Sequence, residues 1–303
     1  MSTGRPYAKK LGIVTGGSRG IGAAVARRLA AKGCNLVIGY GSPRSTDMTR
    51  ALCDELAAAH NVCCAPVQAE LLEPQTAADS ILDAARSLFK SYNASGPFQI
   101  DIVINNAGVS SNQHLNDTEQ GPIQRSEFDR VYTVNVLAPL LLTQVVQPYL
   151  PKDRSGRIVN VSSVSSSIGY QGQSVYAGTK AAIEAMTRVW SRELSENAIV
   201  NCVNPGPAWG DMYERAGPTF WNINQPYVDV APLANYSTDG HSVDLDTEEK
   251  DRFDKVVSEG MGGRRPGLTD EIAGTVDMLC SAEAGWTTGS VVCANGGMRM
   301  SFA

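Results

Sequence analysis

The segment 10–33 constrains the fold of this chain more than any other. It reads as a short apolar strand, Lys10-Leu-Gly-Ile-Val-Thr15, then the turn Gly16-Gly-Ser-Arg-Gly20-Ile-Gly22, then an alanine-rich helix that stops near Gly33. Glycines let the backbone approach a pyrophosphate, and a helix that begins there offers free N–H groups and the positive end of its dipole. The spacing is G-x-x-x-G-x-G, and its place between strand and helix predicts a dinucleotide-binding unit.

Strands and helices alternate along the rest of the chain. Apolar runs typical of strands cover 35–40, 62–69, 99–105, 157–163, 199–206 and 289–297. Helical patterns cover 46–60, 74–91, 128–150 and 174–194, and the segment 263–273 leads into a further helix that ends near 281. This alternation is typical of α/β proteins, in which right-handed crossovers place helices on both faces of a parallel sheet. We therefore predict one Rossmann-type domain over residues 1–303, with a doubly wound parallel sheet of about seven strands.

The end of the second strand bears on the choice of cofactor. An acid at this point commonly accepts hydrogen bonds from the ribose 2′-hydroxyl of NAD. Here Tyr40 is followed by Gly-Ser-Pro-Arg44-Ser45, and Arg19 sits within the glycine turn. Two guanidinium groups and a serine suit a 2′-phosphate, which points to NADP, although both arginines could be merely solvated.

The stretch 163–180 holds the residues best suited to chemistry. Tyr176 and Lys180 are four residues apart, so a helix that starts near Ser174 places both on one face. A nearby ammonium favours the ionised form of a phenol. Ser163 ends a predicted strand thirteen residues before Tyr176, at the sheet edge where ligands bind. A Tyr-x-x-x-Lys pair alone is more often a solvated helix face, so its neighbours decide.

Two further features lie near this edge. Asn105-Asn-Ala-Gly108 is a small-residue turn after the fourth strand, where a bulky side chain would collide with a ligand across the sheet. Asn135 lies inside the predicted helix 128–150 and is costly when buried unless it is hydrogen-bonded. It could cap a backbone bend, which is compatible with a place beside the site.

The alternating pattern breaks over 207–262. Six aromatic residues fall within 207–236, a much higher density than in the whole chain, where aromatics make up 7%: Trp209, Tyr213, Phe220, Trp221, Tyr227 and Tyr236. A connection of this length is typical of a lid or binding loop, and a helical satellite with its own core is equally compatible. The acidic run from Asp244 to Glu249 lacks the glycine and final glutamate of an EF-hand, so we expect no metal there.

Composition excludes other classes of function. The net charge is −5, so no basic field favours nucleic acid or an anionic membrane. No apolar leader and no run of about 18 apolar residues is present. Seven cysteines without a C-x-x-C pair indicate reduced, packed thiols and a soluble, cytoplasmic protein. We expect His60, His114 and His241 at the surface, with His114 at the rim of the pocket.

With these pieces placed, the chain resembles the short-chain dehydrogenase/reductase family over residues 10–298. Six motifs stand in the family's order and spacing: Thr15-Gly16-x-x-x-Gly20-x-Gly22, Asn105-Asn-Ala-Gly108, Asn135, Ser163, Tyr176-x-x-x-Lys180 and Pro205-Gly206. The second-strand end is similar to that of NADP-dependent members. The segment 263–273 and the turn at 288–297 look like the tail of acyl-carrier-protein ketoreductases and their relatives.

The resemblance implies a role for each matched residue. Tyr176 would protonate a carbonyl oxygen as hydride arrives from NADP(H), Lys180 would favour the ionised phenol and hold the ribose, and Ser163 would bind the oxyanion. Asn135 would hold a water that links Lys180 to solvent. The implied cofactor-binding residues are Gly16, Ser18, Arg19, Gly20, Ile21, Gly22, Tyr40, Arg44, Glu70, Asn106, Ala107, Gly108, Tyr176, Lys180, Pro205 and Gly206.

The family pattern leaves the substrate open. The segment after Pro205-Gly206 is longer than in ketoreductases of fatty-acid synthesis, and its aromatic residues suit a bulky apolar ketone or imine of secondary metabolism. The candidate substrate residues are His114, Trp209, Tyr213 and Trp221. A 3-oxoacyl-thioester reductase is the first alternative, and a cofactor-binding protein that shapes a reactive intermediate is the second. Apolar residues on several sides of 128–150 and 174–194 predict a homo-oligomer, a dimer or tetramer.

Overall fold

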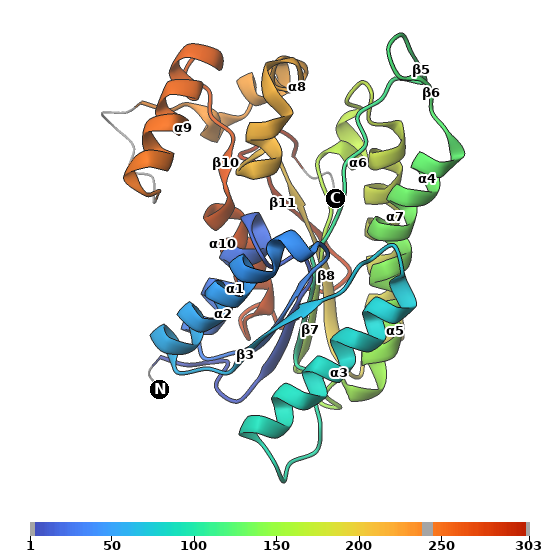
Figure 1. Ribbon diagram of the computed structural model, residues 1–303, viewed down its shortest axis with the longest axis vertical. Coiled ribbons are helices and arrows are strands. Elements are labelled where there is room, and N and C mark those ends of the chain that lie inside the picture. The colour runs from blue at the N-terminus through green and yellow to red at the C-terminus, as the bar shows by residue number, and fades with distance from the viewer. Residues whose placement is uncertain (1–3, 238–244, 301–303) are drawn as a thin grey trace.

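A seven-stranded parallel sheet forms the centre of the protein (Figure 1). The computed structural model describes residues 4–237 and 245–300. The strand order is β11-β8-β7-β4-β1-β2-β3. The strands are β1 Leu11–Val14, β2 Asn35–Tyr40, β3 Cys64–Gln68, β4 Ile102–Asn105, β7 Gly156–Val161, β8 Ala198–Pro205 and β11 Val291–Ala294. The predicted doubly wound α/β fold is confirmed.

Helices cover both faces of this sheet because successive side chains of a strand point to opposite sides. On one face Val14 and Ile38 pack with α1 (Gly20–Ala31), α2 (Thr46–His60) and α10 (Thr269–Cys280). On the other face Ile13 and Val37 pack with α3 (Pro74–Tyr92), α5 (Ala138–Val146) and α7 (Ser174–Glu193). The predicted starts at 46, 74 and 174 are met, and the helix expected to follow the segment 263–273 and to end near 281 is α10, which begins at Thr269.

The single helix expected over 128–150 is in fact interrupted. It comprises α4 (Arg125–Tyr132), a π-helical turn (Thr133–Leu137), α5 and a short 3-10 turn (Gln147–Tyr149). The polar loop before it contains a small hairpin of β5 (Asn116–Asp117) and β6 (Gly121–Pro122). By length and composition alone this helical stretch could cross a membrane. It packs beside the sheet against α3 and α7, as a core helix does.

The segment 207–262 forms a helical satellite with its own core. It contains β9 (Ala208–Trp209), α8 (Asp211–Asp229), a 3-10 turn (Pro232–Ala234) and α9 (Thr247–Gly260), and β9 pairs with β10 (Gly267–Leu268). Its buried cluster is Trp209, Tyr213, Tyr236, Phe253, Val257, Met261 and Leu268. Figure 1 shows α8 and α9 beyond one end of the sheet, the end at which α6 (Ser165–Ile168) also lies. His241 and Asp244 lie outside the described residues.

Candidate active site

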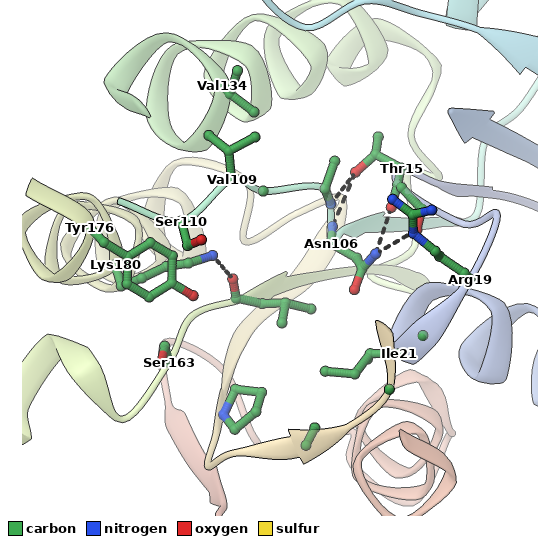
Figure 2. Close-up of a pocket in the computed structure, with 18 of the residues that line it drawn as sticks. Thr15, Arg19, Ile21, Asn106, Val109, Ser110, Val134, Ser163, Tyr176 and Lys180 are labelled. Atoms are coloured by element: carbon green, nitrogen blue, oxygen red, sulfur yellow. Dashed lines mark hydrogen bonds between the residues drawn. The ribbon is translucent and has the colours of Figure 1, made fainter. Parts of the chain in front are cut away.

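A cavity of about 490 Å³ opens at the carboxyl ends of the strands. The strand order reverses between β4 and β1, which is where open α/β sheets bind ligands. The wall of the cavity is formed by the glycine turn, the ends of β2, β4, β7 and β8, and the start of α8. Figure 2 shows Thr15, Arg19 and Asn106 on one side of this cavity and Ser163, Tyr176 and Lys180 on the other.

The glycine turn is locked to the end of β4. Gly16 and Gly20 have φ values of +61° and +58°, which glycine adopts without strain. The Asn106 Nδ2 donates to the carbonyl oxygens of Thr15 and Gly16 at 2.9 and 3.0 Å. A Cβ at Gly22 would lie 2.4 Å from the Gly16 oxygen. Gly22 therefore supports the turn from behind, and it does not line the cavity.

The end of β2 presents small and polar groups to the cavity. Tyr40, Gly41, Ser42 and Ser45 line it, and Arg19 reaches the same region from the glycine turn. The 3-10 turn at Pro43–Ser45 is capped by the Ser42 hydroxyl, which accepts from the Arg44 N–H at 3.3 Å. Glu70 is also in the wall, and its carboxylate accepts from the Leu72 N–H. The side chain of Arg44 is exposed outside the wall.

The predicted trio meets at the opposite end of the cavity. Lys180 is 5% exposed, and its Nζ lies 5.5 Å from the ring centroid of Tyr176. The same Nζ donates to the Val161 carbonyl oxygen at 2.9 Å (Figure 2). Ser163, just past the end of β7, lines the same cavity. One helix face and one strand end thus bring a phenol, an ammonium and a hydroxyl together.

The π-helical turn places Asn135 beside this trio. Its Oδ1 accepts from the Val109 N–H at 2.9 Å, and its Nδ2 donates to the Val109 carbonyl and to Thr179 Oγ1. A Cβ at Gly108 would lie 3.3 Å from Asn135 Oδ1 and 3.4 Å from Lys180 Nζ. Gly108 therefore lies close to both side chains, and a Cβ at this position would require the Asn135 amide to shift by a few tenths of an ångström. The buried Asn135 side chain thus links the segment after β4 to α7. Its amide oxygen and its amide nitrogen are both hydrogen-bonded, as a polar side chain inside a helix requires.

A row of polar side chains leads away from Ser163. Ser163 Oγ lies 3.2 Å from Ser165 Oγ, which donates to Gln173 Oε1 at 2.6 Å. Gln173 Nε2 in turn donates to Asn112 Oδ1 at 2.9 Å. Ser165 and Gln173 are 4% and 5% exposed, and all four residues line the cavity. Gln173 was not among the predicted site residues, although its place three residues before Tyr176 could have indicated it.

Aromatic side chains of the satellite form the facing wall. Trp209, Tyr213 and Phe220 line the cavity together with the buried Asn224. The Tyr213 hydroxyl and the Trp209 Nε1 are buried without a hydrogen-bond partner among the described residues. Burial raises the pKa of Tyr213, so this phenol stays protonated at neutral pH.

Most predicted site residues therefore reach one cavity. Gly16, Ser18, Arg19, Gly20, Ile21, Tyr40, Glu70, Asn106, Ala107, Gly108, Ser163, Tyr176, Lys180, Pro205, Gly206, Trp209 and Tyr213 line it, while Asn135 stands directly behind. Gly22, Arg44, His114 and Trp221 are outside its wall. Trp221 instead donates from Nε1 to the Tyr213 carbonyl oxygen. In the part of the chain that the structure describes, no group of three or more acidic, histidine or cysteine side chains could hold a metal ion.

Residues 10–219 match the family model of short chain dehydrogenases. The chain belongs to the short-chain dehydrogenase family. This dehydrogenase is 66% identical to the L-xylo-3-hexulose reductase of Hypocrea jecorina, over 99% of both chains. It is 52% identical to the L-xylulose reductase of Aspergillus niger, over 96% of this chain and 97% of that one. Both relatives are reductases, in line with an oxidoreductase.

Two solved structures have the same architecture as this dehydrogenase. A blue fluorescent protein from a metagenomic library, in complex with NADPH, superposes with a TM-score of 0.76 at 28% identity and covers 98% of this chain and 100% of its own. A short chain dehydrogenase from Burkholderia cenocepacia J2315, in complex with NADP, gives a TM-score of 0.71 at 26% identity and covers 97% of this chain and 99% of its own.

Proposed function

We propose that this dehydrogenase reduces the keto group of a polyhydroxy ketone with NADPH. The observation that carries the proposal is the convergence of Ser163, Tyr176 and Lys180 on one cavity. The Tyr176 phenol donates its proton to the carbonyl oxygen as that oxygen gains charge. The ammonium of Lys180 favours the phenolate that remains, and the Ser163 hydroxyl binds the same oxygen.

The other half of the cavity fits a dinucleotide. The φ values of Gly16 and Gly20 and the N-terminus of α1 make a turn that a pyrophosphate can approach. When bound, NADPH supplies the hydride. Arg19, Ser42 and Ser45 are suited to hold a 2′-phosphate, since no acid follows Tyr40 to bind a free 2′-hydroxyl. The relatives solved with NADPH and NADP support this choice.

The polar row beside Ser163 favours a hydroxylated substrate. Ser165, Gln173 and Asn112 offer hydrogen-bond donors and acceptors along one side of the cavity. A site built to bond hydroxyl groups discriminates strongly against substrates that lack them. The names of the two fungal relatives, both reductases of sugar ketones, support the same class.

A bulky apolar ketone or imine is the second candidate. The rings of Trp209, Tyr213 and Phe220 favour it, because together they form an aromatic wall within reach of a ligand at Tyr176. On either reading, we propose that the satellite 207–262 selects the substrate and that the strand ends carry out the reaction.

The test measures NADPH and NADH oxidation with L-xylulose, L-xylo-3-hexulose, an aromatic ketone, a cyclic imine and a 3-oxoacyl thioester. We expect the sugar ketones with NADPH to give the highest kcat/KM. Tyr176→Phe should lower kcat about 10²- to 10⁴-fold, the usual worth of a general acid. Tyr92→Phe on α3, away from the cavity, is the matched control. Faster turnover of the aromatic ketone or the thioester would overturn the substrate class, and an active Tyr176→Phe would overturn the mechanism.

We also propose a cytoplasmic homo-oligomer. Exposed apolar side chains on α4, α5 and α7 and the π-helical turn would be covered by a second copy: Phe128, Leu137, Leu140 and Val189. The seven cysteines are free thiols, which suits a reducing compartment. Sedimentation as a monomer at micromolar concentration would contradict the oligomer.

A further inference from the structure

The carboxylate of Glu184 gathers three hydrogen bonds on one oxygen. Ser162 Oγ and Ser166 Oγ each donate to Glu184 Oε1 at 2.7 Å, and Asn204 Nδ2 donates to the same atom at 2.9 Å. Glu184 is half-buried and lies outside the cavity wall. Hydrogen bonds to an ionised acceptor are about twice as strong as neutral ones. This carboxylate therefore anchors its three donors firmly.

The three donors surround Ser163. Ser162 and Ser166 flank it along the chain, and Asn204 Nδ2 donates to the Ser163 carbonyl oxygen at 2.9 Å. The backbone of the same segment is fixed to β8, because the Ser162 N–H donates to Val203 and the Val164 N–H to Pro205. Glu184 thus holds the segment that carries the Ser163 hydroxyl from three directions.

Glu184 stands on the helix that carries the proton donor. It follows Lys180 by four residues and Tyr176 by eight, so all three lie along one side of α7. Tyr176 and Ser163 both line the cavity and must both reach one carbonyl oxygen (Figure 2). They come from separate elements, α7 and the end of β7. A direct link between these elements is therefore needed to set their separation.

We propose that Glu184 is a positioning residue that fixes the Ser163 hydroxyl relative to the Tyr176 phenol. The inference rests on the proposed carbonyl reduction, in which both groups meet the same oxygen. Glu184 contacts neither substrate nor cofactor and acts through Ser162, Ser166 and Asn204. Without its carboxylate these donors lose a common acceptor, and the segment 162–166 is held only by its backbone bonds to β8 and by its remaining side-chain bonds.

The first measurement compares kcat, KM and NADPH affinity in Glu184→Ala, Glu184→Gln and Glu193→Gln. Misplacement of a group by about 1 Å can cost about 10²-fold, so we expect Glu184→Ala to lower kcat about 10- to 100-fold with NADPH affinity unchanged. Glu184→Gln keeps a carbonyl oxygen as acceptor and should recover most of that loss. Glu193, exposed near the end of the same helix, is the matched control and should behave as wild type.

A double substitution separates positioning from general damage. If Glu184 acts through Ser163, adding Glu184→Ala to Ser163→Ala should cost little more than Ser163→Ala alone, because the group to be positioned is already absent. A double variant slowed by the full factor of Glu184→Ala would overturn the proposal. So would a Glu184→Ala enzyme with wild-type kcat. Should Glu184→Ala not fold, Ser166→Ala removes one anchor outside the cavity and should give a smaller loss of the same kind.

Hydrogen exchange tests the anchor without turnover. Backbone amides of 162–168 should exchange faster in Glu184→Ala than in wild type or Glu193→Gln. Equal exchange would overturn the proposal even if the true substrate were unknown. If the wild-type enzyme reduced none of the sugar ketones and the amides of Glu184→Ala still exchanged faster, only the proposed substrate class would be overturned.

Discussion

Lys180 donates a hydrogen bond from its buried ammonium to the carbonyl oxygen of Val161 at 2.9 Å. Val161 is the last residue of β7, so the bond fixes the charge of α7 at the end of a neighbouring strand. The ammonium also lies 5.5 Å from the Tyr176 ring centroid. A buried charge is costly unless it is well bonded, so we propose that this ammonium has a use beyond packing.

Lys180→Met tests that use. Methionine keeps the length and apolar stem of lysine but removes the charge, so we expect kcat to fall by about 10²-fold or more, as for loss of one electrostatic group. The melting temperature should change little, because removal of a buried charge offsets the loss of the bond to the Val161 carbonyl oxygen. Steady-state kinetics and a thermal scan on the same sample check both. An unfolded variant, or an active one, would contradict this account.

Asn135→Leu should be damaging for a different reason. The leucine removes both bonds to the Val109 backbone and leaves a half-buried N–H and C=O without their partner, at a cost of about 1 kcal/mol each. We expect a lower melting temperature and a loss of activity together. Asn105→Ala serves as a comparison for the loss of stability. Asn105 Nδ2 also donates to a buried side-chain atom, Asn160 Oδ1, but Asn105 lies outside the cavity wall. Equal stability of Asn135→Leu and wild type would be incompatible with the observed bonds.

The sequence was sufficient to predict the sheet, because each strand is a short apolar run with clear glycine or polar limits. It was also sufficient to predict that Tyr176, Lys180 and Ser163 lie at one sheet edge, once their spacing was combined with the neighbouring motifs. The sequence suggested that Asn135 could cap a backbone bend, but the π-helical form of the turn and the bonds from Asn135 to Val109 have no local sequence signal.

The satellite shows the opposite limit. The density of aromatic residues in 207–262 predicted a lid or binding segment, but not which of the aromatic side chains line the cavity. Tyr213 and Trp221 are eight residues apart on α8, yet Tyr213 lines the cavity while Trp221 packs behind it and bonds the Tyr213 carbonyl. The helix is kinked at Gly217, where φ is +73°, so simple helical periodicity does not relate the two positions.

A third prediction concerns acid stability at the rim of the cavity. The Arg130 guanidinium donates to both carboxylate oxygens of Glu127 and to the Ser110 carbonyl. Hydrogen bonds from Arg130 lower the pKa of Glu127, against an opposing effect of burial. A carboxyl group whose pKa is lower in the folded than in the unfolded protein stabilises the fold at pH values above the ordinary pKa of glutamate. This contribution is lost as the pH falls through the pKa of the folded state.

Glu127→Gln should therefore lower the melting temperature at pH 7. The difference in melting temperature from wild type should become smaller from about pH 5 downwards, because the Glu127 carboxylate of wild type then becomes protonated. Melting curves from pH 7 to pH 3 measure this. The exposed Glu193→Gln serves as the control and should show no such trend. A difference between Glu127→Gln and wild type that is constant across this range would show that the ion pair is not its source.

The last prediction follows from the burial of the thiols. Burial raises the pKa of Cys202 and of Cys280 to about 12, and it raises that of Cys34 as well. Since the thiolate is the reactive form, all three should resist iodoacetamide at pH 8 in the native protein. The half-buried Cys63 and Cys293 should be labelled first. Peptide mass spectrometry gives the order, and labelling in urea, where every cysteine should react, controls for reagent and peptide recovery. Early native labelling of Cys202 would mean that β8, which lies between β11 and β7 in the sheet, opens far more readily than its packing indicates.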